Sequence, residues 1–207
     1  MNIYKSLFLG LVCSAGMHCT FAQTTVWNPD NQNGTFTNPI MWGDWPDPDL
    51  IRVDDKFYLV STSMHYVPGC PIAVSEDLVN WEMAGYALDR YDEDPKYDMQ
   101  GGNLYLNGAW ATTIRHHNGK FYVGFCTPYG WGRETGHFSI CIADDVKGPW
   151  ERTIFPEYLY DPGLFFDEDG KVYVVHGQGT LYLTELNSDV KSVKGKPVKT
   201  VSYTHLR

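Results

Sequence analysis

The stretch that decides the fold reads Trp45-Pro46-Asp47-Pro48-Asp49-Leu50-Ile51-Arg52-Val53-Asp54-Asp55-Lys56-Phe57-Tyr58-Leu59-Val60. Asp47 stands between two prolines, and each proline fixes its own φ and pushes the residue before it toward extended geometry. A run typical of β-strands, Leu50–Val60, follows at once. The arrangement suits a carboxylate that has little backbone freedom and points in one direction. The alternative is an ordinary Asp-Pro turn that opens a strand.

The same pattern returns twice, at intervals of about 50–65 residues. The second copy is Trp110–Phe125 and the third is Asp161–Val175. Each copy predicts a short apolar strand, a tight turn and a second strand rich in aromatic and β-branched residues. Asn118-Gly119 and Asp169-Gly170 are strong hairpin signals, because such turns need residues that tolerate positive φ.

Recurrence of a unit of this size predicts an all-β fold, the β-propeller, in which each unit is one four-stranded blade. About three blades are expected, over residues 45–88, 108–153 and 159–195. A β-sandwich also has short strands with turn signals, but it gives no reason for the same sequence pattern to recur at regular intervals. The tail Lys194–Arg207 is polar and predicts no further strand.

Superposing the glycine turns places Asp161 at the position of Trp110, and one deletion in the first hairpin puts Asp47 at the same place. The two Asp-Pro pairs therefore begin the innermost strands of the first and third units. In a propeller these strand starts converge on the central channel, so two carboxylates would face one cavity with an indole between them. Such a cavity meets the requirements of glycoside cleavage.

The composition excludes several classes of partner. The 207 residues include 16 Lys and Arg against 25 Asp and Glu, which argues against nucleic acid or an anionic membrane as a partner. Aromatic residues make up 15% of the chain, as suits a neutral ligand with flat apolar faces such as a sugar. No apolar run beyond the N-terminus is long enough to predict a membrane span.

The N-terminus predicts export. Residues 1–22 read as a signal peptide, with Lys5 as the positive start, a short apolar core and Thr20-Phe21-Ala22 as the cleavage site. Residues 23–37 are expected to form a lead-in segment, and residues 38–207 a partial propeller. A secreted or periplasmic protein follows from this interpretation.

Three cysteines remain after the signal peptide: Cys70, Cys126 and Cys141. Their spacing does not predict a zinc site, and we expect them to be small buried hydrophobic residues. A Cys126–Cys141 bridge is the alternative. The pair His116-His117 precedes a predicted turn and is expected in a solvated loop rather than at a metal, because adjacent residues of a strand point to opposite faces.

Taken together, several motifs resemble glycoside hydrolase family 43, and within it the β-xylosidases and α-L-arabinofuranosidases. They are Asn38-Pro39, Gly43, Pro46-Asp47-Pro48, Pro68-Gly69-Cys70-Pro71-Ile72, Ser75-Glu76-Asp77-Leu78-Val79-Asn80-Trp81, Trp110-Ala111, Ile114-Arg115 and Asp161-Pro162-Gly163-Leu164-Phe165. The resemblance implies a five-bladed propeller that hydrolyses xylosyl or arabinofuranosyl linkages of plant hemicellulose with inversion at the anomeric carbon. Its partner would be an oligo- or polysaccharide.

The resemblance also implies roles for particular residues. Asp47 matches the general base, and Asp161 matches the acidic residue that orients the general acid and tunes its pKa. Met64, His65 and Trp110 match positions that line the sugar pocket. The resemblance implies no cofactor and no catalytic metal, and it allows a structural calcium ion in the channel of the full-length protein. Independently of the family, Trp131 is expected at the pocket rim, where it either stacks on a sugar or packs.

One part of the family pattern has no match. The general acid of the family is a glutamate in a Glu-Gly-Pro-His-like motif of a later blade, and neither Glu168 nor Glu185 stands in such a motif. We therefore expect an N-terminal fragment that lacks the later blades. The alternative function is a non-catalytic carbohydrate-binding propeller or an inert propeller fragment.

Overall fold

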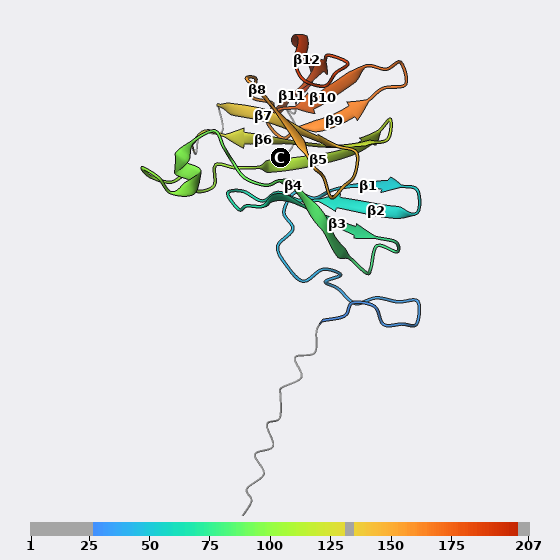
Figure 1. Ribbon diagram of the computed structural model, residues 1–207. Coiled ribbons are helices and arrows are strands. Elements are labelled where there is room, and N and C mark those ends of the chain that lie inside the picture. The colour runs from blue at the N-terminus through green and yellow to red at the C-terminus, as the bar shows by residue number, and fades with distance from the viewer. Residues whose placement is uncertain (1–26, 131–134, 203–207) are drawn as a thin grey trace, which may run out of the picture.

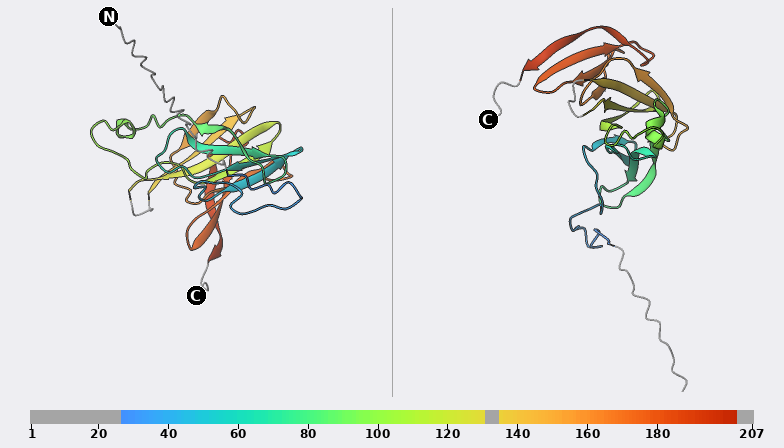
Figure 2. Two further views of the ribbon diagram at one scale, coloured as in Figure 1. Left: turned by 90° about the horizontal axis from the view of Figure 1, so that it is seen from below. Right: turned by 90° about the vertical axis from the view of Figure 1, so that its left-hand side faces the viewer.

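The computed structural model describes residues 27–130 and 135–202 of the chain. These residues form three four-stranded antiparallel sheets, and within each sheet the strands follow one another in chain order. Figure 1 shows the sheets stacked face to face, and the right-hand view of Figure 2 shows that they fan out along an arc. Three consecutive sheets of this kind are three propeller blades, so the predicted all-β fold is confirmed.

The blades have the following bounds. Blade 1 consists of β1 (Asp49–Val53), β2 (Lys56–Val60), β3 (Gly69–Ser75) and β4 (Glu82–Leu88). Blade 2 consists of β5 (Trp110–His117), β6 (Lys120–Pro128), β7 (Gly136–Ala143) and β8 (Glu151–Phe155). Blade 3 consists of β9 (Gly163–Phe166), β10 (Val172–His176), β11 (Thr180–Leu186) and β12 (Val193–Ser202). A short 3-10 helix, η1 (Pro95–Asp98), lies in the connection between β4 and β5.

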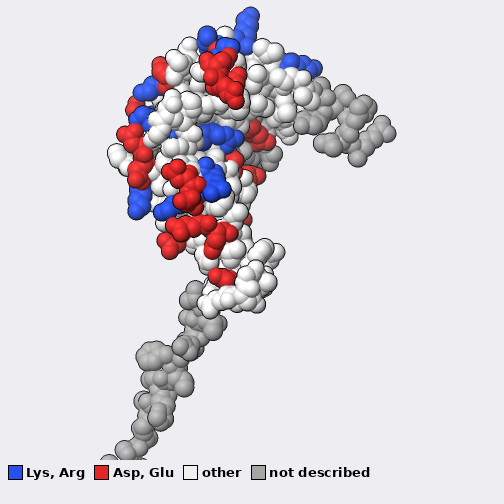
Figure 3. Space-filling view, turned by 90° about the vertical axis from the view of Figure 1, so that its right-hand side faces the viewer, with Lys and Arg blue, Asp and Glu red and all other residues white. Residues whose placement is uncertain are grey.

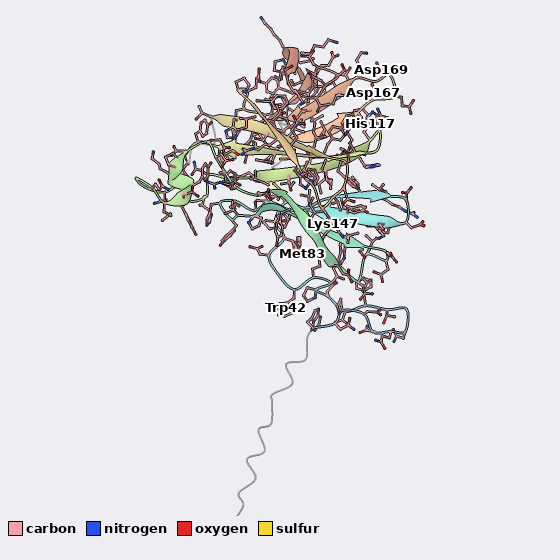
Figure 4. The ribbon with its side chains drawn as sticks, in the orientation of Figure 1. Trp42, Met83, His117, Lys147, Asp167 and Asp169 are labelled. Carbon is pink, nitrogen blue, oxygen red and sulfur yellow. The ribbon has the colours of Figure 1, made fainter. Side chains whose placement is uncertain are left out.

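The first strands of the three blades lie side by side and run in the same direction. Strand β1 contacts β5, and β5 contacts β9 (Figure 1). Their hairpin turns point to one end of the molecule, where His117, Asp167 and Asp169 are labelled in Figure 4. The residues that precede the three strands therefore lie at the opposite end, together with the β4–β5 connection.

The hairpin turns follow the predicted residues. Strands β5 and β6 are joined through Asn118 and Gly119, whose φ angles of 50° and 75° suit a type I′ turn. The turn of blade 3 is one residue longer, because Asp167 N–H bonds to the Lys171 carbonyl and leaves three residues between them. Superposing Gly170 on Gly119 therefore shifts the sequence alignment of blade 3 by one residue. The ladder register places Ala111, not Trp110, at the position of Asp47 and Asp161.

The core consists of two clusters, one on each side of blade 2. Side chains alternate between the two faces of a strand, so Val123 and Phe125 of β6 face blade 1 while Tyr122 faces blade 3. Full burial of an aliphatic or aromatic side chain of this size stabilises the fold by about 1.5–3 kcal/mol. Blade 2 is thus held by hydrophobic packing on both faces.

The three cysteines are free and buried, as the hydrophobic interpretation predicts. The alternative Cys126–Cys141 bridge is not formed, because the ladder pairs Cys141 with Val123 and Cys126 with Phe138. Burial raises the pKa of both thiols, Cys126 and Cys141, to about 12.

Two further sequence-based predictions are wrong. In the described part of the expected tail, residues 194–202 are not without a strand, because they belong to β12, which pairs with β11 along the outer edge of blade 3. Lysines on an exposed edge strand are compatible with pairing and discourage further association, which hid the strand in the sequence. His116 and His117 do not lie in a loop either. They end β5, where the His117 ring stacks on Phe166 with centroids 4.4 Å apart.

Across the described residues, no helix is long and apolar enough to cross a membrane. Acidic and basic side chains are interspersed over the face shown in Figure 3, without a broad area of a single charge.

Candidate active site

Asp47, Ala111 and Asp161 share one unusual backbone conformation. Their φ angles are 46°, 47° and 49°, in the left-handed region that non-glycine residues seldom occupy. In each blade, this residue lies six positions before the last residue that pairs across the first hairpin. That last residue is Val53 in blade 1, His117 in blade 2 and Asp167 in blade 3. The repeat therefore turns the chain sharply where each innermost strand begins. Non-glycine residues held in this region cluster at functional sites.

The Asp47 side chain is held by a threonine of its own blade. The Thr62 hydroxyl donates to Asp47 Oδ2 at 3.1 Å and accepts the Ala111 N–H at 2.8 Å. The backbone N–H of Thr62 also bonds to the Pro46 carbonyl at 3.0 Å. The single proton of the hydroxyl is therefore directed at the Asp47 carboxylate, while a lone pair of its oxygen accepts the Ala111 N–H. Thr62 is not predicted as a site residue from the sequence.

Asp161 lies near the Cys126 thiol and close enough to the Tyr158 phenol for its charge to act on it. Burial raises the pKa of Cys126 and of Tyr158, and the negative charge of Asp161 adds a smaller rise to both. The Cys126 thiol also donates to the Trp110 carbonyl, with sulfur and oxygen 3.7 Å apart. Trp110 is thereby joined to the surroundings of Asp161 on one side, and its neighbour Ala111 is joined to Asp47 through Thr62 on the other.

The pocket-wall positions form a contiguous group between blades 1 and 2. Met64 and Ala109 exchange backbone hydrogen bonds at 3.0 and 2.9 Å. The His65 ring lies between Tyr66 and Tyr105, with centroids 4.4 and 4.1 Å away. Met64 and His65 are both partly buried, so each keeps some surface for a ligand.

The Trp110 indole is fixed from the β4–β5 connection. Its Nε1–H donates to the Leu106 carbonyl at 2.6 Å, and the side chain is partly buried. Of the predicted site residues, Asp47, Met64, His65, Trp110 and Asp161 lie at the same end of the three blades. Trp131 lies outside the described residues.

A second carboxylate of the Asp-Pro-Asp motif joins the blades rather than facing a ligand. Asp49 Oδ2 accepts the Ile114 N–H at 2.9 Å, the Thr113 hydroxyl at 2.9 Å and Arg115 Nη1 at 2.6 Å. The Thr113 hydroxyl in turn accepts the Leu164 N–H at 3.3 Å. This chain of bonds links the innermost strands of all three blades and fixes the spacing of the candidate catalytic positions.

Within residues 27–130 and 135–202, no group of three or more His, Cys, Asp or Glu side chains is arranged to hold a metal ion. A cavity of about 710 Å³ lies elsewhere, between the residues that precede β1 and the outer strands of blade 1. Trp42 and Met83 mark this region in Figure 4. None of the predicted site residues lines the cavity.

Comparison with known proteins gives a consistent picture. A non-reducing end α-L-arabinofuranosidase of Bacteroides ovatus is 40% identical over 152 residues, which cover 72% of this chain and 28% of the relative. A β-xylosidase of Formosa agariphila is 35% identical over 159 residues, which cover 74% of this chain and 26% of the relative. The chain thus spans little more than a quarter of the length of these relatives.

Solved structures agree with the sequence relatives. A bifunctional GH43-CE protein of Bacteroides eggerthii superposes with a TM-score of 0.73 at 38% identity, over 80% of this chain and 21% of that chain. A GH43 protein from Bacillus licheniformis superposes with a TM-score of 0.70 at 29% identity, over 83% of this chain and 34% of that chain. The family described as glycosyl hydrolases family 43 matches residues 36–206. Because this match covers most of the chain, the chain belongs to glycosyl hydrolases family 43.

Proposed function

We propose that the chain carries part of the active site of an inverting glycosidase that releases xylosyl or arabinofuranosyl units from plant hemicellulose. Family membership supports hydrolysis of a glycosidic bond, and the names of the relatives support pentosyl units. One observation carries the proposal. Asp47 and Asp161 occupy the same position in blades 1 and 3, with the same left-handed backbone, and Trp110 belongs to the blade between them.

In the proposed reaction Asp47 is the general base. Its carboxylate takes a proton from a water molecule as that water attacks the anomeric carbon, on the face opposite the leaving oxygen. An inverting site holds its acid and base roughly 6.5–9.5 Å apart to admit the water. The hydrogen bond from Thr62 fixes the orientation of the carboxylate that receives the proton.

Asp161 would act on the general acid rather than on the sugar. A carboxylate close to a second carboxyl group raises the pKa of that group by like-charge repulsion, which keeps it protonated until it donates to the leaving oxygen. We place the general acid, a glutamate, in the part of the relatives' length that this chain does not span. Met64, His65 and Trp110 would hold the sugar ring, and residues 1–22 would direct the protein to the periplasm or the outside of the cell.

The test uses a substrate whose leaving group needs almost no protonation. The 207-residue chain should cleave 2,4-dinitrophenyl β-D-xyloside slowly even without the general acid, because only water activation is then required. Asp47→Asn should abolish this cleavage. Asp55→Asn, an exposed change in the β1–β2 turn of the same blade, is the matched control and should cleave like the parent chain.

Other outcomes would overturn the proposal. Equal rates for the parent chain and Asp47→Asn would exclude Asp47 as the base. Binding of xylosides by a chain that cleaves none of them would favour a non-catalytic carbohydrate-binding propeller. Neither binding nor a cooperative thermal transition would favour an inert fragment.

A further inference from the structure

A buried tyrosine joins the two segments that carry the pocket-wall positions. Tyr91 belongs to the β4–β5 connection and is 2% exposed. Its hydroxyl donates to the Met64 carbonyl at 3.0 Å and accepts the Ala109 N–H at 2.7 Å. Met64 leads into His65 on blade 1, and Ala109 leads into Trp110 on blade 2. One phenol oxygen thus contacts the backbone on both sides of the pocket wall.

The two segments approach too closely for any side chain at their junction. A Cβ atom added to Gly108 would lie 1.6 Å from the Met64 carbonyl oxygen and 2.6 Å from the Tyr91 hydroxyl. The Met64 backbone is itself left-handed, with a φ of 52°. Because the surrounding structure must hold such a conformation in place, the hydrogen bonds around Met64 determine where the pocket wall lies.

The Tyr91 ring is held by a second aromatic ring and by a guanidinium group. Tyr97 of η1 stacks on it with centroids 4.4 Å apart and planes 20° apart. The Arg152 guanidinium of β8 lies 5.7 Å from the ring centroid, and the same guanidinium forms an ion pair with Glu93 of the β4–β5 connection. The hydroxyl therefore has little freedom to move away from its two backbone partners.

We propose that Tyr91 is a positioning residue for the sugar pocket, whose hydroxyl holds the Met64–His65 and Trp110 segments at the spacing that a bound pentosyl unit requires. The inference rests on the proposed function, since it assumes that these segments contact the sugar. Tyr91 itself is buried behind the wall and acts only through the backbone of Met64 and Ala109.

The test compares Tyr91→Phe with Tyr97→Phe in the 207-residue chain. Tyr91→Phe keeps both ring contacts and removes the two hydrogen bonds. Tyr97→Phe keeps the same ring stack, and within the described part of the chain its hydroxyl makes no hydrogen bond that would be lost. Affinity for methyl β-D-xylopyranoside and methyl α-L-arabinofuranoside is measured by NMR titration, with the thermal transition recorded for each variant.

The expected result is a three- to tenfold weaker affinity for Tyr91→Phe, corresponding to about one hydrogen bond, and an unchanged affinity for Tyr97→Phe. Parent-like affinity in Tyr91→Phe would overturn the inference, and so would an equal loss in Tyr97→Phe. Loss of the cooperative transition in Tyr91→Phe would also overturn it, because the phenol would then be needed for folding rather than for positioning.

Amide hydrogen exchange separates this inference from the proposed function. If the parent chain binds neither glycoside, the proposed function fails for this chain. The placement of the wall by Tyr91 is then judged by the exchange rates of the Met64 and Ala109 amides, which bond across the junction. Faster exchange at both amides in Tyr91→Phe, with other strands unchanged, supports the holding role, and unchanged exchange overturns it.

Discussion

At the scale of single residues, the carboxylate of Asp47 is oriented by a hydroxyl group. Thr62 is 4% exposed and connects Asp47 to the backbone of the next blade. The sequence predicts Asp47 as a site residue because its Asp-Pro motif recurs at Asp161 and matches the general base of the family. No local pattern indicates Thr62, whose partners are 15 and 49 residues away. Contacts of that range appear only when the blades are assembled.

Thr62→Val tests this role. The change keeps the shape of the side chain and removes the hydroxyl, so the free energy of unfolding should fall by about 1–2 kcal/mol because the Ala111 N–H loses its partner. Cleavage of 2,4-dinitrophenyl β-D-xyloside should fall as well. Thr62→Ser keeps the hydroxyl and should retain more of both properties in urea denaturation and rate measurements. A valine variant as stable and active as the serine variant would contradict the role.

His137 should make the stability depend on pH. It is 4% exposed, and burial, assisted by the Arg152 charge, lowers its pKa to about 4. The folded state then binds fewer protons than the unfolded state between about pH 6.5 and pH 4. The contribution of His137 to the free energy of unfolding is therefore fully present above this range and is lost as the pH falls through it. The loss should reach up to about 3 kcal/mol at pH 4.

The measurement is the free energy of unfolding of the parent chain and of His137→Gln at pH 7, 5.5 and 4. Glutamine does not titrate, so the variant should lose less stability over this range. Glu93, which lies 3.6 Å from His137, is present in both chains. Parallel pH profiles would show that His137 is not the responsible group.

At the scale of elements, the blades are joined by a bond that repeats. The Asp49 side chain accepts the Ile114 N–H of the next innermost strand, and the Thr113 side chain accepts the Leu164 N–H of the one after. Asp49 and Thr113 are equivalent in the ladders of blades 1 and 2. Gly163 stands at the same position of blade 3 and has no side chain to repeat the bond.

Thr113→Val should therefore destabilise the contacts of blade 2 with both neighbours. Thr113 is 2% exposed, and valine would leave the buried Leu164 N–H without its partner, at a cost of about 1–3 kcal/mol. Thr153→Val, on the outer strand β8 and away from the junction, is the control. Urea denaturation should show the larger loss for Thr113→Val, and equal losses would exclude the inter-blade bond as its cause.

Prediction from sequence succeeds for elements with strong local signals. The Asn118-Gly119 turn requires positive φ, and this predicts the position of the hairpin. The recurrence of strands rich in aromatic residues predicts the blade as the repeating unit. The register of Ala111 could not be predicted, because it depends on one extra residue in the turn of blade 3 and on the bulge in β5. Strand β12 was missed because its partner β11, rather than its own composition, makes it a strand.

At the scale of the whole molecule, the arc has an outer sheet face that nothing in the described residues covers. Phe165, Val175 and Val198 lie on the face of blade 3 that points away from blade 2, with exposed fractions of 52%, 38% and 62%. Large exposed apolar surfaces and unpaired sheet edges favour association between copies of a chain.

We expect concentration-dependent self-association of the 207-residue chain in sedimentation velocity. Val198→Lys should weaken it, because a charge on this face opposes burial against a second copy. Leu78→Lys changes an exposed residue of blade 1 in the same way and should leave the association unchanged. A monomer at all concentrations would show that this face does not mediate self-association.

The difference between the two inter-blade links also has a mechanical consequence. Blade 1 is clamped to blade 2 by a carboxylate with three donors, whereas the equivalent link from blade 2 to blade 3 is one threonine oxygen. If the two ends of the chain were pulled apart in an optical trap, blade 3 should separate and unfold first, at a lower force than blades 1 and 2. The first extension step would then match the length of blade 3, and blades 1 and 2 would rupture together afterwards.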